Sequence, residues 1–324
     1  MNDCHINKDA RIYVPGHTGL VGSACVRVLS ERGYRNILTR DLYELDLTDS
    51  ARTETFFQHE KPEHVVMCAA KVGGILANNT YPAEFIHVNL TISTNVIHSA
   101  WRTGVRRLIY LGSSCIYPRD CPQPMREEYL LSGPLEPTNR PYALAKIAGI
   151  EMCWAYNRQY DTRFLAIMPT NMYGPGDNYD LQTSHVLPAL IRKMHEAKTA
   201  NAPTVTLWGT GASRREFLYS EDLAAAVCHL LELSEDDYRS LTSSETVCPL
   251  LNIGYGHDIT IRELAGLVRE IVGFRGEIAW DATKPDGMPL KLLDSTRIRN
   301  AGWEPRISLR EGIARVYGQY LGTL

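Results

Sequence analysis

The stretch RIYVPGHTGLVG, residues 11–22, decides the fold, because it joins a short apolar run to a helical pattern through a turn of glycines. Residues 11–15 predict a first strand, and the helix after them is expected to run to about Arg32. A glycine turn in this position lets the backbone approach a pyrophosphate at the positive end of the helix. The spacing is G-x-x-G-x-x-G, and a purely structural turn is the alternative. The strand–turn–helix context favours dinucleotide binding.

Further apolar runs alternate with helical segments through the first half of the chain. Strands are predicted at residues 36–39, 65–70, 108–111 and 164–168, with helices at 49–61, 83–103 and 142–160. This alternation predicts an α/β fold, a doubly wound parallel sheet of the Rossmann type. Turn formers become frequent after residue 172. We therefore predict a nucleotide-binding domain over 1–172, with sheet elements contributed by later segments, and a smaller, mainly substrate-binding C-terminal lobe over 173–324.

Three side chains near the centre of the sequence predict proton transfer to a carbonyl oxygen. Ser113 follows the strand at 108–111, while Tyr142 and Lys146 lie four residues apart on one face of a helix. An ammonium beside a phenol is expected to lower the Tyr142 pKa from its usual value of about 10. A Tyr-x-x-x-Lys pair also occurs by chance in many helices. The serine at a strand end and the glycine turn favour the catalytic interpretation.

Arg40, directly after the second predicted strand, bears on the choice between NADP and NAD. An acidic residue at this point holds the ribose 2′-hydroxyl of NAD, whereas an arginine accommodates the 2′-phosphate of NADP. Arg40 therefore favours NADP, although Asp41 follows it and a solvated surface arginine is the alternative.

The composition bounds the class of protein. The 324 residues are 44% hydrophobic and 22% charged with a net charge of -3, which is typical of a soluble globular protein. No basic excess points to nucleic acid or to an acidic membrane surface, and no apolar stretch is long enough to span a membrane. The first ten residues are too polar for a signal peptide. Eight cysteines without a Cys-x-x-Cys pair predict reduced thiols, a cytoplasmic location and no metal site.

These motifs together resemble those of the extended short-chain dehydrogenase/reductases that act on nucleotide-sugars. The agreement is greatest with members that convert GDP-4-keto-6-deoxy-D-mannose to GDP-L-fucose by 3,5-epimerisation and 4-reduction, and it extends over nearly the whole chain. Its most specific stretches are AAKVGG (69–74), GSSCIYP (112–118), MPTN (168–171) and SHVLP (184–188).

The resemblance implies that Cys115 and His185 act as acid and base, since both exchange protons near neutral pH. Ser113 and Tyr142 would stabilise the enolate oxygen. Tyr142 would then donate a proton during hydride addition to C4, while Lys146 holds the nicotinamide ribose. Cys115 stands two residues after Ser113, so both are expected to face the sugar from an extended segment. A buried structural cysteine and a capping or surface histidine are the alternatives.

The resemblance also implies the contacts of NADP and of a GDP-sugar. The cofactor contacts are Gly16, His17, Thr18, Gly19, Leu20, Val21, Gly22, Arg40, Leu111, Gly112, Ser113, Ser114, Lys146, Pro169, Thr170, Asn171, Met172 and His185. The GDP-sugar contacts are Lys193, Trp208, Arg215 and Asp286. Arg215 and Lys193 could clamp the diphosphate, or equally be solvated surface charges. The family pairs two long helices, here about 84–103 and 142–160, into a homodimer.

Two departures and several alternatives remain. Thr18 stands where bacterial members often carry an arginine that helps with the NADP phosphate, and Gly176 stands where a histidine is common. A 4,6-dehydratase would need an Asp-Glu pair, which Ser114-Cys115 cannot replace. The alternatives are an NAD-dependent 4-epimerase, an enzyme making a related GDP-colitose or GDP-heptose, and, from another class, a non-catalytic NADP-sensing regulator. The complete Ser-Tyr-Lys set argues against the regulator.

Overall fold

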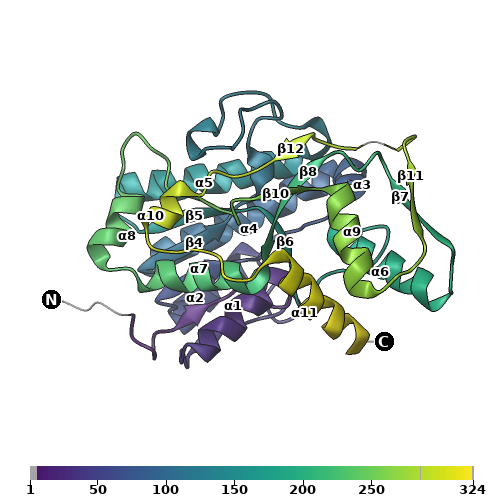
Figure 1. Cartoon of the computed structure of the whole chain (residues 1–324). Coiled ribbons are helices and arrows are strands. Elements are labelled where there is room, and N and C mark those ends of the chain that lie inside the picture. The colour runs from purple at the N-terminus through teal and green to yellow at the C-terminus, as the bar shows by residue number, and fades with distance from the viewer. Residues whose placement is uncertain (1–5, 285, 323–324) are drawn as a thin grey trace.

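A parallel sheet forms the centre of the protein in the computed structural model, which describes residues 6–284 and 286–322 (Figure 1). Residues 1–5, half of the polar N-terminal stretch, lie outside the described residues. In order across the sheet, the six strands found in the described part are β2 (Ile37–Leu38), β1 (Ile12–Tyr13), β3 (His64–Met67), β4 (Arg107–Leu111), β5 (Phe164–Pro169) and β9 (Leu250–Ile253). All neighbouring strands are parallel. The predicted doubly wound sheet is confirmed.

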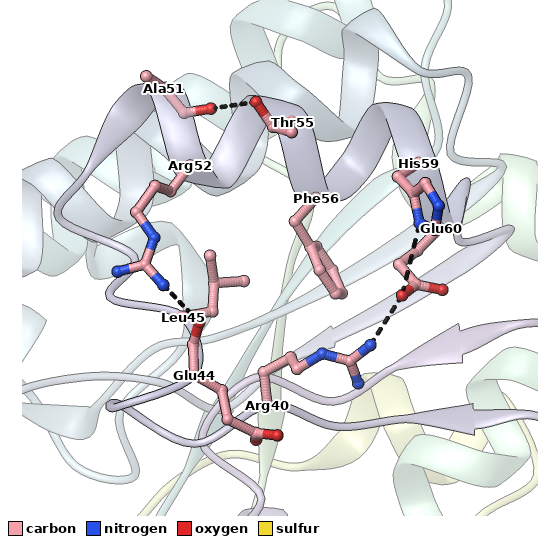
Figure 2. Close-up of a pocket in the computed structure, with 9 residues that line it drawn as sticks. All are labelled: Arg40, Glu44, Leu45, Ala51, Arg52, Thr55, Phe56, His59 and Glu60. Carbon is pink, nitrogen blue, oxygen red and sulfur yellow. Dashed lines mark hydrogen bonds and ion pairs between the residues drawn. The ribbon is translucent and has the colours of Figure 1, made fainter.

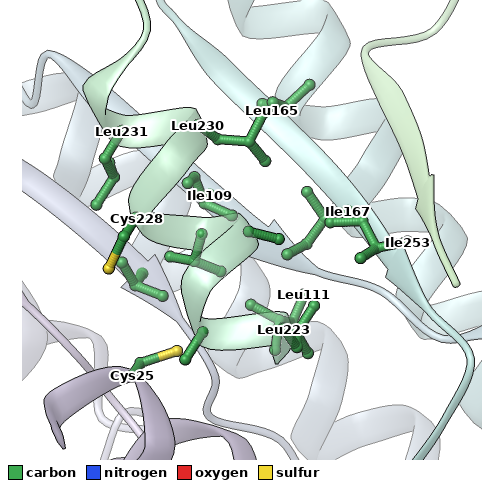
Figure 3. Packing of buried hydrophobic residues seen from close by; sticks show 14 of the residues in the cluster. Cys25, Ile109, Leu111, Leu165, Ile167, Leu223, Cys228, Leu230, Leu231 and Ile253 are labelled. Carbon is green, nitrogen blue, oxygen red and sulfur yellow. The ribbon is translucent and has the colours of Figure 1, made fainter. Parts of the chain in front are cut away.

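Helices cover both faces of this sheet. One face carries α1 (Leu20–Glu31) and α7 (Ser220–Glu232), and the other carries α2 (Ser50–Glu60), α4 (Pro82–Arg102) and α5 (Arg140–Tyr160). Figure 3 shows leucines of α7 packed against Ile109, Leu165 and Ile167 of the sheet. Burial of such side chains stabilises the sheet by roughly 1.5–3 kcal/mol each. Because α7 and β9 come from beyond residue 172, later segments complete the sheet.

Local signals explain where the helices begin. The Asp49 carboxylate caps α2 by accepting a hydrogen bond from the Arg52 N–H at 3.0 Å. Pro141 stands in the first turn of α5, where its missing N–H leaves no hydrogen bond unmade. Most of the predicted strands are shorter than expected, because their last residues already belong to the loops at the carboxyl edge.

The second half of the chain adds a lobe beside that edge. Its elements are β6 (Asn171–Tyr173), β8 (Arg214–Tyr219), β10 (Asp258–Thr260) and β12 (Leu290–Lys291) in one sheet, β7 (Thr204–Trp208) and β11 (Glu277–Asp281) in another, and α6 (Val186–Thr199), α9 (Ile261–Val272) and α11 (Leu309–Gly322). The remaining elements are α3 (Ile75–Thr80), α8 (Glu235–Thr242), α10 (Thr296–Asn300) and the 3-10 turns η1 (Ser114–Ile116), η2 (Glu127–Tyr129) and η3 (Pro137–Asn139).

The sequence gives no signal for β8, because this strand lacks polar–apolar alternation. Its last four residues are all buried, as they are covered on both faces. No helix in the described part of the chain is long and apolar enough to cross a membrane.

Candidate active site

The glycine turn lies where the sheet changes its direction of growth. The chain passes from β1 to β2 on one side and then to β3 on the other, and ligands bind such sheets at that switch point. Gly16 has φ +82°, and a Cβ on it would lie 2.8 Å from the Cys68 carbonyl carbon. A Cβ on Gly22 would lie 2.1 Å from the Gly16 carbonyl oxygen. The turn therefore needs glycine at both positions, and its close fit against α1 suits a pyrophosphate.

Tyr142 and Lys146 lie one turn apart at the start of α5. Lys146 is buried, its Nζ donates to the Leu111 carbonyl oxygen at 2.8 Å, and it lies 5.9 Å from the centre of the Tyr142 ring. Burial lowers the pKa of Lys146 to about 8. The helix thus brings phenol and ammonium together at the end of β4, as the four-residue spacing predicts.

The predicted lowering of the Tyr142 pKa is wrong for this structure. Burial of the phenol, followed by the neighbouring thiol of Cys115, raises that pKa well above its ordinary value, while a hydrogen bond with Ser113 opposes the rise. Desolvation is the largest cause, and the only lowering contribution comes from the hydrogen bond with Ser113. Tyr142 is therefore a protonated donor at neutral pH.

Cys115 faces the same group of side chains. Its Sγ donates to Ser113 Oγ at 3.2 Å, and the residue is 7% exposed. The expectation of an extended segment is wrong, because residues 114–116 form the 3-10 turn η1 and only Ser113 is extended. The turn nevertheless directs the thiol back to Ser113. Burial raises the pKa of Cys115, and Lys291 and the hydrogen bond with Ser113 oppose that rise.

His185 stands on the lobe, at the start of α6. It caps the N-terminus of α6 through its backbone, and the residue is exposed to solvent although protein atoms crowd the imidazole closely enough to desolvate it in part. The surrounding protein lowers the pKa of the imidazole by desolvation, which favours the neutral ring. A Cβ built on Gly74 would lie 3.6 Å from the Thr183 carbonyl oxygen, so the segment before His185 lies against the loop after β3.

The four predicted sugar-nucleotide contacts form two pairs on the lobe. Lys193 Nζ lies 5.7 Å from the centre of the Trp208 ring, which is 66% exposed. Asp286 accepts hydrogen bonds from the Thr210 N–H at 2.7 Å and hydroxyl at 2.6 Å. Burial lowers the pKa of Arg215, and Asp286 partly offsets this. Lys284 Nζ also lies 5.7 Å from the centre of the Trp208 ring. An exposed indole beside two cations is a platform for a planar base, and Arg215 can donate to phosphate.

Comparison with known proteins places the chain in a family. Residues 12–240 match the model of the NAD dependent epimerase/dehydratase family. The chain belongs to that family. Relatives include GDP-L-fucose synthase 1 of Arabidopsis thaliana, 54% identical over 97% of this chain and 94% of the relative, and GDP-L-fucose synthase of Escherichia coli, 50% identical over 96% of each. The resemblance inferred from the motifs is confirmed.

Solved structures of similar epimerase/dehydratase enzymes include two from Campylobacter jejuni. A GDP-D-glycero-L-gluco-heptose synthase in the presence of NADPH has a TM-score of 0.92 and 35% identity, with 98% of this chain and 100% of that chain covered. A GDP-mannoheptose C4 reductase with NADP bound has a TM-score of 0.89 and 37% identity, with 98% and 99% covered.

In this member of the family, the Arg40 guanidinium already has partners within the protein. Its Nη2 lies 2.7 Å from Glu60 Oε1, its Nη1 donates to the Thr39 carbonyl oxygen, and its guanidinium lies 5.4 Å from the centre of the Phe56 ring. Figure 2 shows this arrangement beside a cavity that α2 covers. A 2′-phosphate would therefore compete with the Glu60 carboxylate for Arg40.

Two of the strand-end residues predicted to contact the cofactor form hydrogen bonds within the protein. Thr170 Oγ1 and Asn171 Nδ2 donate to the Glu216 carbonyl oxygen at 3.2 and 2.7 Å. The Glu216 carboxylate, which is fully buried, accepts from the backbone N–H groups of Gly256 and Leu293. Glu216 thus joins β8 to the segments that flank β10 and β12.

The sequence motifs do not predict Lys291, which lies beside the same group of side chains. Lys291 stands in β12, is paired in register with Arg215 of β8, and its Nζ lies 3.4 Å from Ser114 Oγ. Burial lowers its pKa, which the Cys115 thiol opposes and the Arg215 charge reinforces. No local signal marks Lys291, because a lysine between leucines, with Asp294 close behind, is typical of an ordinary edge strand.

Proposed function

We propose that this enzyme converts GDP-4-keto-6-deoxy-D-mannose to GDP-L-fucose, by 3,5-epimerisation followed by NADPH-dependent reduction at C4. The single observation that carries the proposal is the 3.2 Å hydrogen bond from Cys115 Sγ to Ser113 Oγ, beside Tyr142. A thiol that can exchange protons, next to Ser113 and Tyr142, supports epimerisation in addition to reduction. Relatives at 50–54% identity over nearly the full chain are GDP-L-fucose synthases.

The proposed cofactor is NADP, which supplies a hydride to C4 when bound. The turn from Gly16 to Gly22 would hold its pyrophosphate, because the turn admits no Cβ at either end. Arg40 would bind the 2′-phosphate in place of its present partner, Glu60. Lys146 would hold the nicotinamide ribose. Further proposed contacts are His17, Thr18, Gly19, Leu20, Val21, Leu111, Gly112, Ser113, Ser114, Pro169, Thr170, Asn171, Met172 and His185.

Epimerisation requires removal of a proton beside the ketone and its return on the other face. The protein holds Cys115 as a thiol and favours a neutral imidazole at His185, so one group can give a proton and the other can take one. Ser113 and Tyr142 can donate hydrogen bonds to the enolate oxygen. The pair thereby exchanges one proton through the substrate without a net change of charge.

Reduction uses the protonated phenol. The raised pKa of Tyr142 keeps its proton available for the C4 oxygen as hydride arrives. Lys146, held to the Leu111 carbonyl oxygen, provides a cation behind the phenol that stabilises the negative charge formed on proton transfer.

The lobe over residues 173–324 would mainly hold the GDP-sugar, and the domain over 1–172 would hold the cofactor. Trp208 and Lys193 would offer the stacking surface for guanine. Arg215, on β8, and Asp286, in the loop before β12, would contact the rest of the GDP-sugar. Lys291, in register with Arg215, adds a second cation toward the diphosphate.

A related GDP-sugar is the second candidate. Solved relatives at TM-scores of 0.89–0.92 act on GDP-heptoses, and a 34% identical relative is a GDP-L-colitose synthase of Yersinia pseudotuberculosis. The identity of 50% or more to GDP-L-fucose synthases favours the deoxyhexose. A 4-epimerase would leave the thiol beside Ser113 without a role.

We also propose a cytoplasmic homodimer. The cysteines of the described residues are all free, which fits a reducing compartment. Helices α4 and α5 pack together and present the aromatic group of His98, Trp101, Tyr156 and Tyr160 at their outer surface. Molar mass from light scattering tests the dimer: two chains are expected, and one chain would contradict it.

Product analysis tests the function. The protein is incubated with GDP-4-keto-6-deoxy-D-mannose and NADPH in D2O, and the product is identified by NMR. GDP-L-fucose labelled with deuterium at C3 and C5 is expected. A reduced sugar without deuterium at these carbons would leave a plain reductase, and turnover only with a GDP-heptose would favour the second candidate.

A further inference from the structure

A cavity of about 350 Å³ opens on the lobe between helix α9 and strand β11. Figure 1 shows these two elements apart from α5, the helix that carries Tyr142 and Lys146, so the cavity is separate from the proposed catalytic groups. Its walls come from one face of α9 and from β11, and the lining residues are Arg262, Gly266, Arg269, Glu277, Ile278 and Trp280.

Gly266 leaves the space at the centre of this cavity. It stands inside α9, where glycine is less favourable than alanine. A Cβ built on it would have no heavy atom within 4 Å, and its φ is not positive, so neither close packing nor the backbone requires glycine. Arg262 and Arg269 stand four residues before it and three after it, on the same helix face. The missing side chain therefore leaves room between two guanidinium groups.

The two arginines differ in their present contacts. The Arg262 guanidinium lies 4.8 Å from the centre of the Trp280 ring, and its Nη2 donates to the Thr210 carbonyl oxygen. Arg269 is exposed, and within the part of the chain that the structure describes its side chain has neither a hydrogen bond nor an ion pair. With Glu277 as the one carboxylate in the lining, the cations are in excess. This arrangement suits a phosphate group, which accepts charge-assisted hydrogen bonds from both guanidinium groups.

The cavity lies behind the turn that follows β7. A Cβ on Gly211 would lie 2.7 Å from Trp280 Cη2, and the Arg262 N–H donates to the Gly211 carbonyl oxygen at 2.9 Å. On the other side of the turn, Asp286 accepts hydrogen bonds from the N–H and the hydroxyl of Thr210. Thr210 is therefore held between Arg262, which lines the cavity, and Asp286, a proposed contact of the GDP-sugar.

We propose that this cavity is a second anion site, which binds the phosphate group of a small metabolite between Arg262 and Arg269 and thereby weakens binding of the GDP-sugar. A bound phosphate would compete with the Thr210 carbonyl oxygen for the Arg262 guanidinium, and the charged oxygen is the stronger acceptor. Thr210 would then lose its contact on the cavity side, and Asp286 would lose a fixed partner. This coupling rests on the proposed function, whereas binding of the anion does not.

Isothermal titration calorimetry of the full-length protein tests the site. Saturating NADP⁺ and GDP first fill the proposed cofactor and substrate sites, and inorganic phosphate or AMP is then titrated at constant ionic strength, because salt screens exposed charges. One site per chain is expected. Tighter binding of AMP would identify a phosphate monoester whose ring lies against Trp280, and equal binding would identify the inorganic ion. Failure of NADP⁺ or GDP to bind would count against the proposed function and not against this cavity.

Three variants show whether the anion occupies the cavity. Arg269→Ala should weaken binding by about tenfold or more, the effect of losing a hydrogen bond to a charged group. Gly266→Leu should abolish binding, because it fills the space, keeps both charges and favours the helix. Arg275→Ala, at an exposed arginine just beyond α9, is the control and should bind like the parent. No saturable binding of either probe, or an equal loss in Arg275→Ala, would overturn the site.

Steady-state kinetics with GDP-4-keto-6-deoxy-D-mannose and NADPH test the coupling. The anion that binds more tightly should raise the KM for the GDP-sugar by roughly fivefold or more, the usual size of coupling between two sites, and leave kcat unchanged. Gly266→Leu should keep the parent's constants and show no response to the anion. An unchanged KM at a saturating anion concentration would overturn the coupling. A rise in KM that persists in Gly266→Leu would show that the anion competes at the substrate site, which would also overturn it.

Discussion

Glu60 holds Arg40 in an ion pair of 2.7 Å at the end of α2. Both side chains are partly buried, so this pair is more than an exposed surface contact. Arg40, the residue proposed to bind the 2′-phosphate, is therefore already paired with a carboxylate of the same chain.

Replacing either partner should change cofactor choice in opposite directions. Arg40→Ala should raise the KM for NADPH by roughly tenfold with little effect for NADH, since one charge-assisted contact is lost. Glu60→Gln should lower the KM for NADPH, because the phosphate no longer competes. Steady-state kinetics with both cofactors measure this. Arg35→Ala, at an exposed arginine paired with Asp9, is the control; equal changes for NADH and NADPH would defeat the assignment.

Tyr142→Phe should remove the proton donor. NADPH oxidation is expected to fall by roughly 10²–10⁴, the usual contribution of general acid catalysis. NADPH affinity, measured by fluorescence titration, should stay within a factor of about two. Tyr160→Phe, at the far end of the same helix, serves as the control. Retained turnover in Tyr142→Phe would remove the phenol from the reduction.

Cys115→Ser should separate the two halves of the reaction. Solvent deuterium entry at C3 and C5 should fall by roughly 10² or more, because serine is a far weaker acid–base group. The change is read by NMR of the recovered substrate. Cys121→Ser, at a partly buried free thiol, is the control. Unchanged exchange in Cys115→Ser would exclude the thiol.

Lys291→Met should raise the pKa of the Cys115 thiol, because the Lys291 ammonium is the main group that counteracts the rise in pKa caused by burial. The rate of Cys115 alkylation by iodoacetamide should therefore rise at higher pH than in the parent protein. Mass spectrometry of the modified peptide follows this rate. An unshifted pH profile would show that Lys291 does not act on the thiol.

Lys146 makes a prediction for stability against pH. Its pKa is about 8 in the fold and 10.5 in the unfolded chain. Between these values the unfolded chain binds more protons, so this group makes stability rise with pH from about 8 to 10.5 and level off beyond. Lys146→Met should therefore raise Tm at pH 7, and the gain should shrink across that window. Lys198→Met is the matched control, at an exposed lysine that also donates to a backbone carbonyl; an equal gain there would contradict the effect of burial.

The sequence was sufficient for the sheet and for the central part of the site because their signals are local. Helices α4 and α5 lie within two residues of the ranges predicted for them, 83–103 and 142–160, and each has a proline in its first turn. The spacing of Tyr142 and Lys146 likewise follows from helical geometry alone.

The remaining features depend on contacts between distant segments. Lys291 contacts Ser114 although the two are 177 positions apart in sequence, and no periodic pattern predicts that contact. The Tyr142 pKa was misjudged because the sequence shows the neighbouring ammonium but not the depth of burial. The Arg40–Glu60 pair was missed for the same reason, since only the packing of α2 brings the two together.

The buried carboxylate of Glu216 has a mechanical consequence. It accepts hydrogen bonds from the backbone between β9 and β10, at Gly256, and from the backbone just after β12, at Leu293, and it is the direct sequence neighbour of Arg215. A displacement of Lys291 or Arg215 would therefore be transmitted through Glu216 to the main chain just after β9, at the edge of the central sheet. The seam between the two halves of the molecule is therefore stiff along this line.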